Sequence, residues 1–205
     1  MSDQSVILFF FDYVDPLSWI MEHRLQTLVH TDQESSDHAS IRRAGPRIER
    51  LPLELAPPGT PPLLSSDPAW QARTDEALAA ATIDGLRYEP AALIPRSRKA
   101  IELAFLAAER EAFDRVHRML FEAHLSRGLD IGRVDVLVTL ASEAGLDRTE
   151  AKAVLDVDRH TADVEAWRAR ALALGAAGIP TILIGSRRFE GLVGQRDLIA
   201  ALDDL

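Results

Sequence analysis

The chain contains no cysteine among its 205 residues. Without a thiol it can form no disulfide bond, no thiolate nucleophile and no cysteine-ligated metal site. Lysine is almost as scarce: only Lys99 and Lys152 are lysines among 23 basic residues, so arginine carries nearly all the positive charge. These absences exclude sulfur chemistry and leave carboxylate, hydroxyl, imidazole and guanidinium groups as candidates for a functional site.

An excess of positive charge and a long apolar segment are also absent. The formal net charge is -9 at pH 7, which argues against nucleic-acid and anionic membrane partners because their phosphates would be repelled. The longest uncharged stretch, residues 171–186, is broken by glycines and a proline and is too short to span a bilayer. The first residues have neither the basic start nor the small-residue cleavage site of a signal peptide. We therefore expect a cytoplasmic protein without nucleic-acid or membrane partners.

The N-terminal residues combine a strand pattern with a helix start. The apolar run Val6 to Phe11 has the length and composition of a strand that is covered on both faces. Asp15 can cap a following helix, with Pro16 at the first helical position, where its missing N–H costs nothing. The polar residues 30–40 predict a loop. Leucines at every second position between Ile48 and Leu55 predict a second strand.

The remainder of the chain is first helical and then returns to strands. From Pro68 to about Leu174 the apolar residues recur with helical spacing, and Asp147 or Thr149 begins one of these helices. The segments "GIPTILIG" and "RRFEGLVG" predict a hairpin with Gly185 and Ser186 in its turn. Residues 195–205 predict a closing helix. This order of elements indicates an α/β domain with a mixed sheet that is interrupted by a helical insertion.

The junction "FFDYVDPLSW" is the most informative place for a site, because free N–H groups at a helix start bind anions or polar ligands. Asp15 is either a helix cap, which stabilises by roughly 1 kcal/mol, or a residue that contacts a ligand. Ser18 is either an ordinary first-turn serine or a hydrogen-bond donor to a ligand's sulfur or carboxylate. A second unusual feature is Pro180, which opens a predicted strand, a position where a proline is sometimes cis.

Three other groups of residues were candidates. His117 and His124 lie seven residues apart on one predicted helix face, but no third ligand is near them in the sequence, so we expect no metal site. The segment "IRRAGPRIER" collects four arginines in an acidic chain, and it indicates either a site for an anionic ligand or a solvated strand end. We expect Trp19 and Trp167 to be core or cleft-lining residues.

Nearly the whole chain resembles one family. The segments "FFDYVDPLSW", "IPRSRKAIELAFLAAERE" and "LDIGRVDVLVTLASEAGLD" through "GIPTILIGSRRFEGLVGQ" resemble the DsbA family of thioredoxin-like proteins, in particular its FrnE-like branch, known from bacteria. The family includes kappa-class glutathione transferases and 2-hydroxychromene-2-carboxylate isomerases. The resemblance implies a thioredoxin-like α/β fold with a mixed four-stranded sheet in the order 2-1-3-4. Residues 1–64 and 165–205 would form this domain, and residues 65–164 an inserted all-helical domain.

The resemblance assigns roles to the residues at the start of the first helix. FrnE-like proteins carry Cys-Pro-x-Cys, so Asp15 stands at the position of the nucleophilic cysteine, Pro16 is retained, and Ser18 stands at the position of the resolving cysteine. The glutathione-dependent branch carries Ser-Pro-x-Ser, in which the first serine holds the glutathione sulfur. Ser18 fits that pattern and Asp15 does not. Asp15 and Ser18 are therefore degenerate catalytic positions.

The resemblance also assigns ligand-binding residues at the other end of the chain. Pro180 matches the family's cis proline, and the backbone of Ile179 would pair with a bound peptide or glutathione. Gly194 and Gln195, in "LVGQ", resemble the Gly-Ala-Gln of the FrnE-like branch. In the transferases an aspartate that holds the amino group of glutathione follows, where this chain has Arg196.

Three functions follow as hypotheses. The first is a family member, classed by descent as an oxidoreductase, that has lost redox chemistry and binds a peptide or small molecule in its cleft. The second is a glutathione-dependent isomerase or transferase that uses Ser18. The third is an interaction protein without an active site. Asp15 and Arg196 favour the first, since a carboxylate at Asp15 would repel the glutathione thiolate. Glutathione is thus a disfavoured cofactor, no metal is expected, and a homodimer is among the open alternatives for the oligomeric state.

Overall fold

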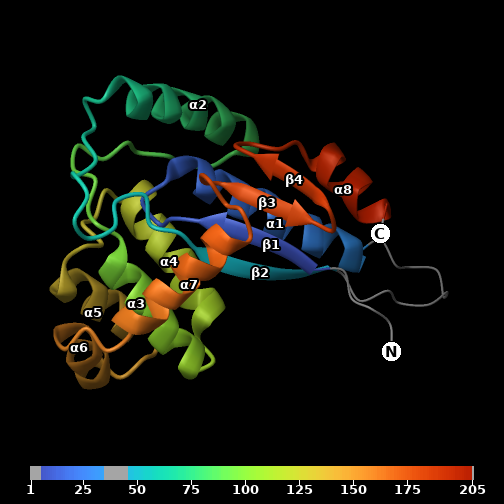
Figure 1. The fold of residues 1–205 in the computed structure, drawn as a ribbon. Helices are drawn as coiled ribbons and strands as arrows, with labels where there is room; N and C mark the ends of the chain where they lie inside the picture. Colours follow the sequence, from blue (N-terminus) through green and yellow to red (C-terminus); the bar gives the residue numbers. More distant parts are fainter. Residues whose placement is uncertain (1–5, 35–45, 205) are drawn as a thin grey trace.

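The computed structural model describes residues 6–34 and 46–204. Its four strands are β1 (Val6–Phe11), β2 (Arg47–Pro52), β3 (Thr181–Ile184) and β4 (Arg187–Glu190). They form one sheet in the order β2-β1-β3-β4 (Figure 1). Strand β1 pairs with β2 in parallel and with β3 antiparallel, and β3 pairs with β4 antiparallel. The predicted mixed sheet and its strand order are confirmed.

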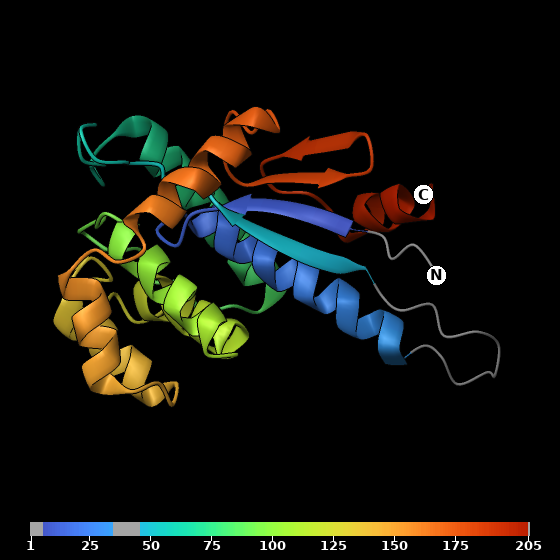
Figure 2. The same cartoon turned by 60° about the horizontal axis from the view of Figure 1, so that its bottom comes forward.

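The helices surround this sheet on both faces and at one end. Helix α1 lies along one face, whereas α7 lies against the other face next to β2, and α3 to α6 gather at one end of the sheet (Figure 2). Helix α2 contacts α1, and α8 closes the chain beside α1. Their bounds are α1 (Pro16–Glu34), α2 (Pro68–Asp84), α3 (Arg98–Glu109), α4 (Phe113–Leu125), α5 (Val134–Glu143), α6 (Arg148–Asp156), α7 (Thr161–Ala173) and α8 (Gln195–Asp203).

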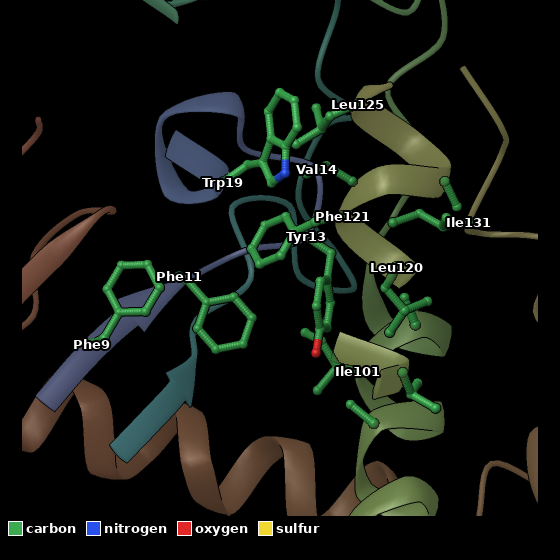
Figure 3. Close-up of a cluster of buried hydrophobic side chains, with 14 of the residues drawn as sticks. Phe9, Phe11, Tyr13, Val14, Trp19, Ile101, Leu120, Phe121, Leu125 and Ile131 are labelled. Carbon is green, nitrogen blue, oxygen red and sulfur yellow. The ribbon is translucent and has the colours of Figure 1, made fainter. Parts of the chain in front are cut away.

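Strand β1 owes its unbroken apolar sequence to burial on both faces. Phe9 and Phe11 belong to the larger core, together with Tyr13 and the side chains of α1, α3 and α4 (Figure 3). Phe10 points to the opposite face and joins a smaller cluster with Leu51 of β2. Because Phe9, Phe10 and Phe11 are buried on both faces of the strand, β1 shows no polar alternation. The buried strand β1 therefore fixes the position at which the chain enters α1.

Two element boundaries differ from the sequence-based expectations. Helix α1 continues to Glu34, so the predicted loop is wrong for residues 30–34, and residues 35–40 lie outside the described residues. No glycine or proline occurs between Pro16 and Gly45 to end the helix earlier. Strand β2 ends at Pro52 rather than Leu55. Its partner β1 ends at Phe11, and the N–H of Leu55 is bound by the carboxylate of Asp12 instead of by a neighbouring strand.

The predicted start of one helix and the predicted hairpin turn are confirmed. Helix α6 begins after Asp147, whose carboxylate accepts a hydrogen bond from the N–H of Glu150. The hairpin turns at Gly185, which adopts a positive φ of 56°.

The division into two domains is not resolved by the elements. The proposed boundary between residues 164 and 165 falls inside α7, which contacts both α3 and β2, so that division stays a prediction. Within residues 6–34 and 46–204, no helix combines the length and apolar character needed to cross a bilayer.

Candidate ligand site at the start of helix α1

Asp15 caps helix α1 as the sequence predicts. Its Oδ2 atom accepts a hydrogen bond from the backbone N–H of Ser18 at 2.7 Å. The same oxygen accepts a second hydrogen bond from the Ser18 hydroxyl at 2.5 Å. This places a carboxylate on the positive end of the helix dipole and satisfies one of its free N–H groups. The Ser18 hydroxyl proton is therefore directed at Asp15.

The other carboxylate oxygen of Asp15 is bound by Arg73, a residue of α2 that the sequence analysis did not identify. The Nε atom of Arg73 donates to Oδ1 of Asp15. Asp15 is fully buried, while the Arg73 side chain is 24% exposed. Both oxygens of Asp15 are thus occupied, and its charge is compensated by a cation that still reaches solvent.

Arg73 also connects Asp15 to the segment that precedes β3. Its Nη2 atom donates to the backbone carbonyl oxygen of Ile179, and the Ile179–Pro180 peptide bond is cis. Ile179 and Pro180 are buried, as are Pro16 and Ser18. One guanidinium therefore joins the start of α1 to the residue that the family resemblance identifies as a ligand-pairing position.

Asp12 is a second buried carboxylate beside this junction. Its Oδ2 accepts from the N–H of Leu55 at 2.8 Å, and its Oδ1 from the N–H of Val14 at 3.3 Å. Burial raises the pKa of Asp12 from 3.8 to about 6, although these hydrogen bonds and one from Ser97 oppose the increase. The N–H of Asp12 points to the Ser18 hydroxyl oxygen at 3.4 Å. Asp12 is thus a group that can hold a proton near neutral pH within the same buried junction.

The predicted ligand residues at the end of the chain lie at the start of α8, a helix that contacts α1. Gly194 precedes α8, and Gln195 is its first residue; both are exposed. The carbonyl of Gly194 accepts from the N–H groups of Asp197 and Leu198. No hydrogen bond or ion pair described for residues 15–18 involves Gly194 or Gln195. Their predicted role, like that of Asp15, Ser18, Pro16, Ile179 and Pro180, stays a prediction.

The two histidines considered in the sequence analysis are buried in different surroundings. Nδ1 of His117 lies 2.8 Å from the Tyr13 hydroxyl, and its Nε2 lies 3.2 Å from Glu22. Glu22 also binds Arg50 at 2.7 Å. Nδ1 of His124 lies 3.1 Å from the carbonyl oxygen of Leu129. In the described part of the chain, no three potential ligands of the His, Cys, Asp and Glu types form a metal-binding group.

Comparison with known proteins identifies the family and the fold of the chain. The family profile described as "DSBA-like thioredoxin domain" matches residues 6–203. The fold is therefore thioredoxin-like, and the chain belongs to the DSBA-like thioredoxin family. No curated protein sequence matches the chain significantly.

Three solved structures illustrate the fold and its range. A probable DsbA oxidoreductase from Streptomyces coelicolor is 23% identical with a TM-score of 0.79, covering 98% of this chain and 89% of that one. A 2-hydroxychromene-2-carboxylate isomerase is 15% identical with a TM-score of 0.73, covering 97% and 93%. The cytosolic disulfide reductase DsbM from Pseudomonas aeruginosa, solved with GSH, is 16% identical with a TM-score of 0.65, covering 97% and 94%. At these identities the likeness establishes the fold, and function must be argued from the site.

Proposed function

We propose that this protein binds a small molecule or peptide at the start of α1 and performs no thiol–disulfide exchange. The observation that carries the proposal is the ion pair between Asp15 and Arg73, at the position where the family resemblance puts the first cysteine. Exchange requires a thiolate that attacks a disulfide, and this chain has no sulfur nucleophile. The fold and its junction would thus serve recognition.

Arg73 explains how such a site could be closed and opened. In the family resemblance, the backbone of Ile179 pairs with the bound ligand, and here Arg73 donates to its carbonyl. A ligand with an N–H group could replace Arg73 at that carbonyl, and a carboxylate on the same ligand could pair with the released guanidinium. Since Arg73 is partly exposed and belongs to α2, a ligand can reach its guanidinium from solvent while Nε stays paired with Asp15. Peptides with a free carboxylate are the ligand class that fits best.

The glutathione-dependent isomerase or transferase is the competing function, and DsbM and the isomerase belong to the same structural neighbourhood. That chemistry would need the Ser18 hydroxyl to face the glutathione sulfur. Here the hydroxyl donates to Asp15, and the Asp15 carboxylate would repel a thiolate. Both observations favour a ligand without a thiolate.

Calorimetry with glutathione and S-methylglutathione distinguishes the two functions. S-methylglutathione retains the carboxylates and peptide N–H groups but has no ionisable thiol. We expect the wild type to bind S-methylglutathione at least as tightly as glutathione, and Arg73→Ala to weaken that binding about tenfold. Arg148→Ala, which removes an exposed arginine from α6, is the matched control and should bind as the wild type does.

Two results would overturn the proposal. One is tighter binding of glutathione than of S-methylglutathione, with Arg73→Ala indistinguishable from wild type, which would favour the glutathione-dependent enzyme. The other is insulin reduction by a preparation free of contaminating oxidoreductase.

The variant Asp15→Ser tests the repulsion between the Asp15 carboxylate and a thiolate. It restores the Ser-Pro-x-Ser pattern, and we expect it to bind glutathione more tightly than the wild type because the repelling charge is gone.

A further inference from the structure

A separate pocket of ≈ 470 Å³ lies where the β2 edge of the sheet meets α3, the start of α4 and α7. Its lining residues do not include Asp15, Ser18, Arg73 or Ile179. Sites for small organic molecules typically have volumes of about 300–1,000 Å³. The pocket is thus large enough for a small molecule and is distinct from the junction at the start of α1.

Aromatic side chains from three elements surround this pocket. Phe105 of α3 and Trp167 of α7 lie with ring centroids 6.2 Å apart and an interplanar angle of 58°. Phe113 of α4 stacks on His117 with ring centroids 5.1 Å apart, and this contact holds the orientation of the Phe113 ring. These three side chains are only partly buried, whereas the other two aromatic lining residues, Phe11 and Tyr13, belong to the buried core. Partly exposed aromatic rings that are held in place offer faces on which a planar apolar ligand can pack.

One wall of the pocket carries the guanidinium of Arg50, which is held in place and has an Nη1 group that can donate to a ligand. Arg50 uses Nε and Nη2 to bind Glu22, and its Nη1 atom lies 3.8 Å from Asp114. The Asp114 side chain is 77% exposed, so it is a weak and displaceable partner. Burial, the largest single influence, raises the pKa of Glu22, but His117 and Arg50 outweigh it and hold that pKa well below its usual range. Glu22 thus stays ionised and keeps Arg50 in place.

The charges around Arg50 leave room for one more anion. Glu49 is paired with Arg170 at 2.6 Å, and Glu22 is engaged inside the core. Arg47 is exposed at the rim of the same pocket. Arg47 and Arg50 are the two described arginines of the "IRRAGPRIER" segment, for which the sequence left an anion site and a solvated strand end as alternatives. Only Asp114 competes with a ligand for Nη1 of Arg50 among the described contacts.

We propose that this pocket binds an aromatic small molecule that carries one anionic group. The ring packs among Phe105, Phe113 and Trp167, and the anionic group replaces Asp114 at Arg50, with Arg47 adding a second positive charge. Arg is suited to this task because its planar donors remain charged at all physiological pH values. This inference concerns a second site and does not depend on the function proposed for the start of α1.

A pair of fluorescent probes tests both halves of the proposal. 8-Anilinonaphthalene-1-sulfonate has an aromatic body and one sulfonate, whereas N-phenyl-1-naphthylamine has the same body without charge. We expect the sulfonate probe to bind the wild type with one-to-one stoichiometry. Ala108→Phe fills the pocket from an exposed lining position of α3 and should weaken binding of both probes at least tenfold. Ala79→Phe makes the same change at an exposed position of α2 and should leave binding unchanged.

Asp114→Asn tests the anion separately. Removing the competing carboxylate should tighten binding of the sulfonate probe about two- to five-fold and leave the uncharged probe unchanged within twofold. Absence of one-to-one binding to the wild type, or unaltered binding to Ala108→Phe, would overturn the pocket as a ligand site. An equal effect of Asp114→Asn on both probes, or no effect on either, would overturn the proposed role of Arg50 in recognising an anion.

Discussion

Helix α1 and its N-terminal cap carry two buried carboxylates that are compensated in different ways. Asp15, at its start, is paired with Arg73 of α2, whose side chain is 24% exposed. Glu22, two turns later, is paired with Arg50 and lies beside His117, and all three are at most 14% exposed. Tyr13, which is hydrogen-bonded to His117, lies within the aromatic core (Figure 3). The Asp15 cluster can therefore open toward solvent, whereas the Glu22 cluster can be opened only by disrupting the core.

The largest effect is expected when the Glu22 cluster is broken. Glu22→Gln keeps the shape of the side chain but leaves Arg50 and His117 buried without their anion. We expect the free energy of unfolding to fall by about 3–5 kcal/mol, the range for removing one partner of a buried ion pair. Urea denaturation at neutral pH measures this. A loss no larger than the loss measured for Asp15→Ala would remove the contrast between Glu22 and Asp15.

Asp12, which precedes both carboxylates in the chain, should make stability depend on pH. Its folded-state pKa of about 6 lies above the ordinary value of 3.8, so the folded state binds a proton more tightly than the unfolded state. The stabilisation from that proton is complete below pH 4 and is lost as the pH rises to about 6, a change of roughly 3 kcal/mol at most. The unfolding free energy of the wild type should therefore fall relative to that of Asp12→Asn as the pH rises over this interval. Urea titrations from pH 4 to 7 would contradict the assignment if that difference were constant.

The sequence was sufficient to predict the framework of the Asp15 cluster. An apolar run, an aspartate and a proline determine a buried strand, a cap and a first helical residue, and these are local preferences. The end of α1 was not predictable in the same way, because residues 30–34 are polar but contain no residue that ends a helix. Polarity alone does not distinguish a loop from an exposed helical turn.

The partners in both clusters could not be found from the sequence. Arg73 lies 58 positions from Asp15, in a helix whose polar residues look like any solvated face. His117 was considered only as a metal ligand, although its nitrogens face Tyr13 and Glu22. Such pairs depend on how α1, α2, β2 and α4 pack together, which no local pattern encodes. The family resemblance supplied the position of Asp15 but gave no reason to look at Arg73.

Removing Asp15 should cost less than changing Glu22. Asp15→Ala deletes the cap and leaves Arg73 without its anion, but Arg73 can turn toward water because it is partly exposed. We expect a loss of roughly 1–3 kcal/mol, which combines a lost cap with a partly screened ion pair. Urea denaturation beside Glu22→Gln measures the order of the two. If Asp15→Ala costs as much as Glu22→Gln, Arg73 cannot be released, and the proposed opening of the site is wrong.

The smallest effect calibrates the others. Asp147 caps α6 with the same geometry as Asp15, since each carboxylate accepts the N–H of the residue three positions later at 2.7 Å. Asp147 is exposed, and no ion pair is described for it, so Asp147→Ala removes a cap alone. We expect a loss of about 1 kcal/mol. The excess of Asp15→Ala over Asp147→Ala then measures what Arg73 and burial add to a bare cap. An excess near zero would mean that Asp15 is a helix cap and nothing more, because its ion pair with Arg73 would then contribute no stability.

A double-mutant cycle identifies the source of a clear excess. If Asp15→Ala costs only about as much as a bare cap when it is introduced into Arg73→Ala, the excess comes from the guanidinium of Arg73. The contrast between the two carboxylates of α1 would then rest on measured energies as well as on burial.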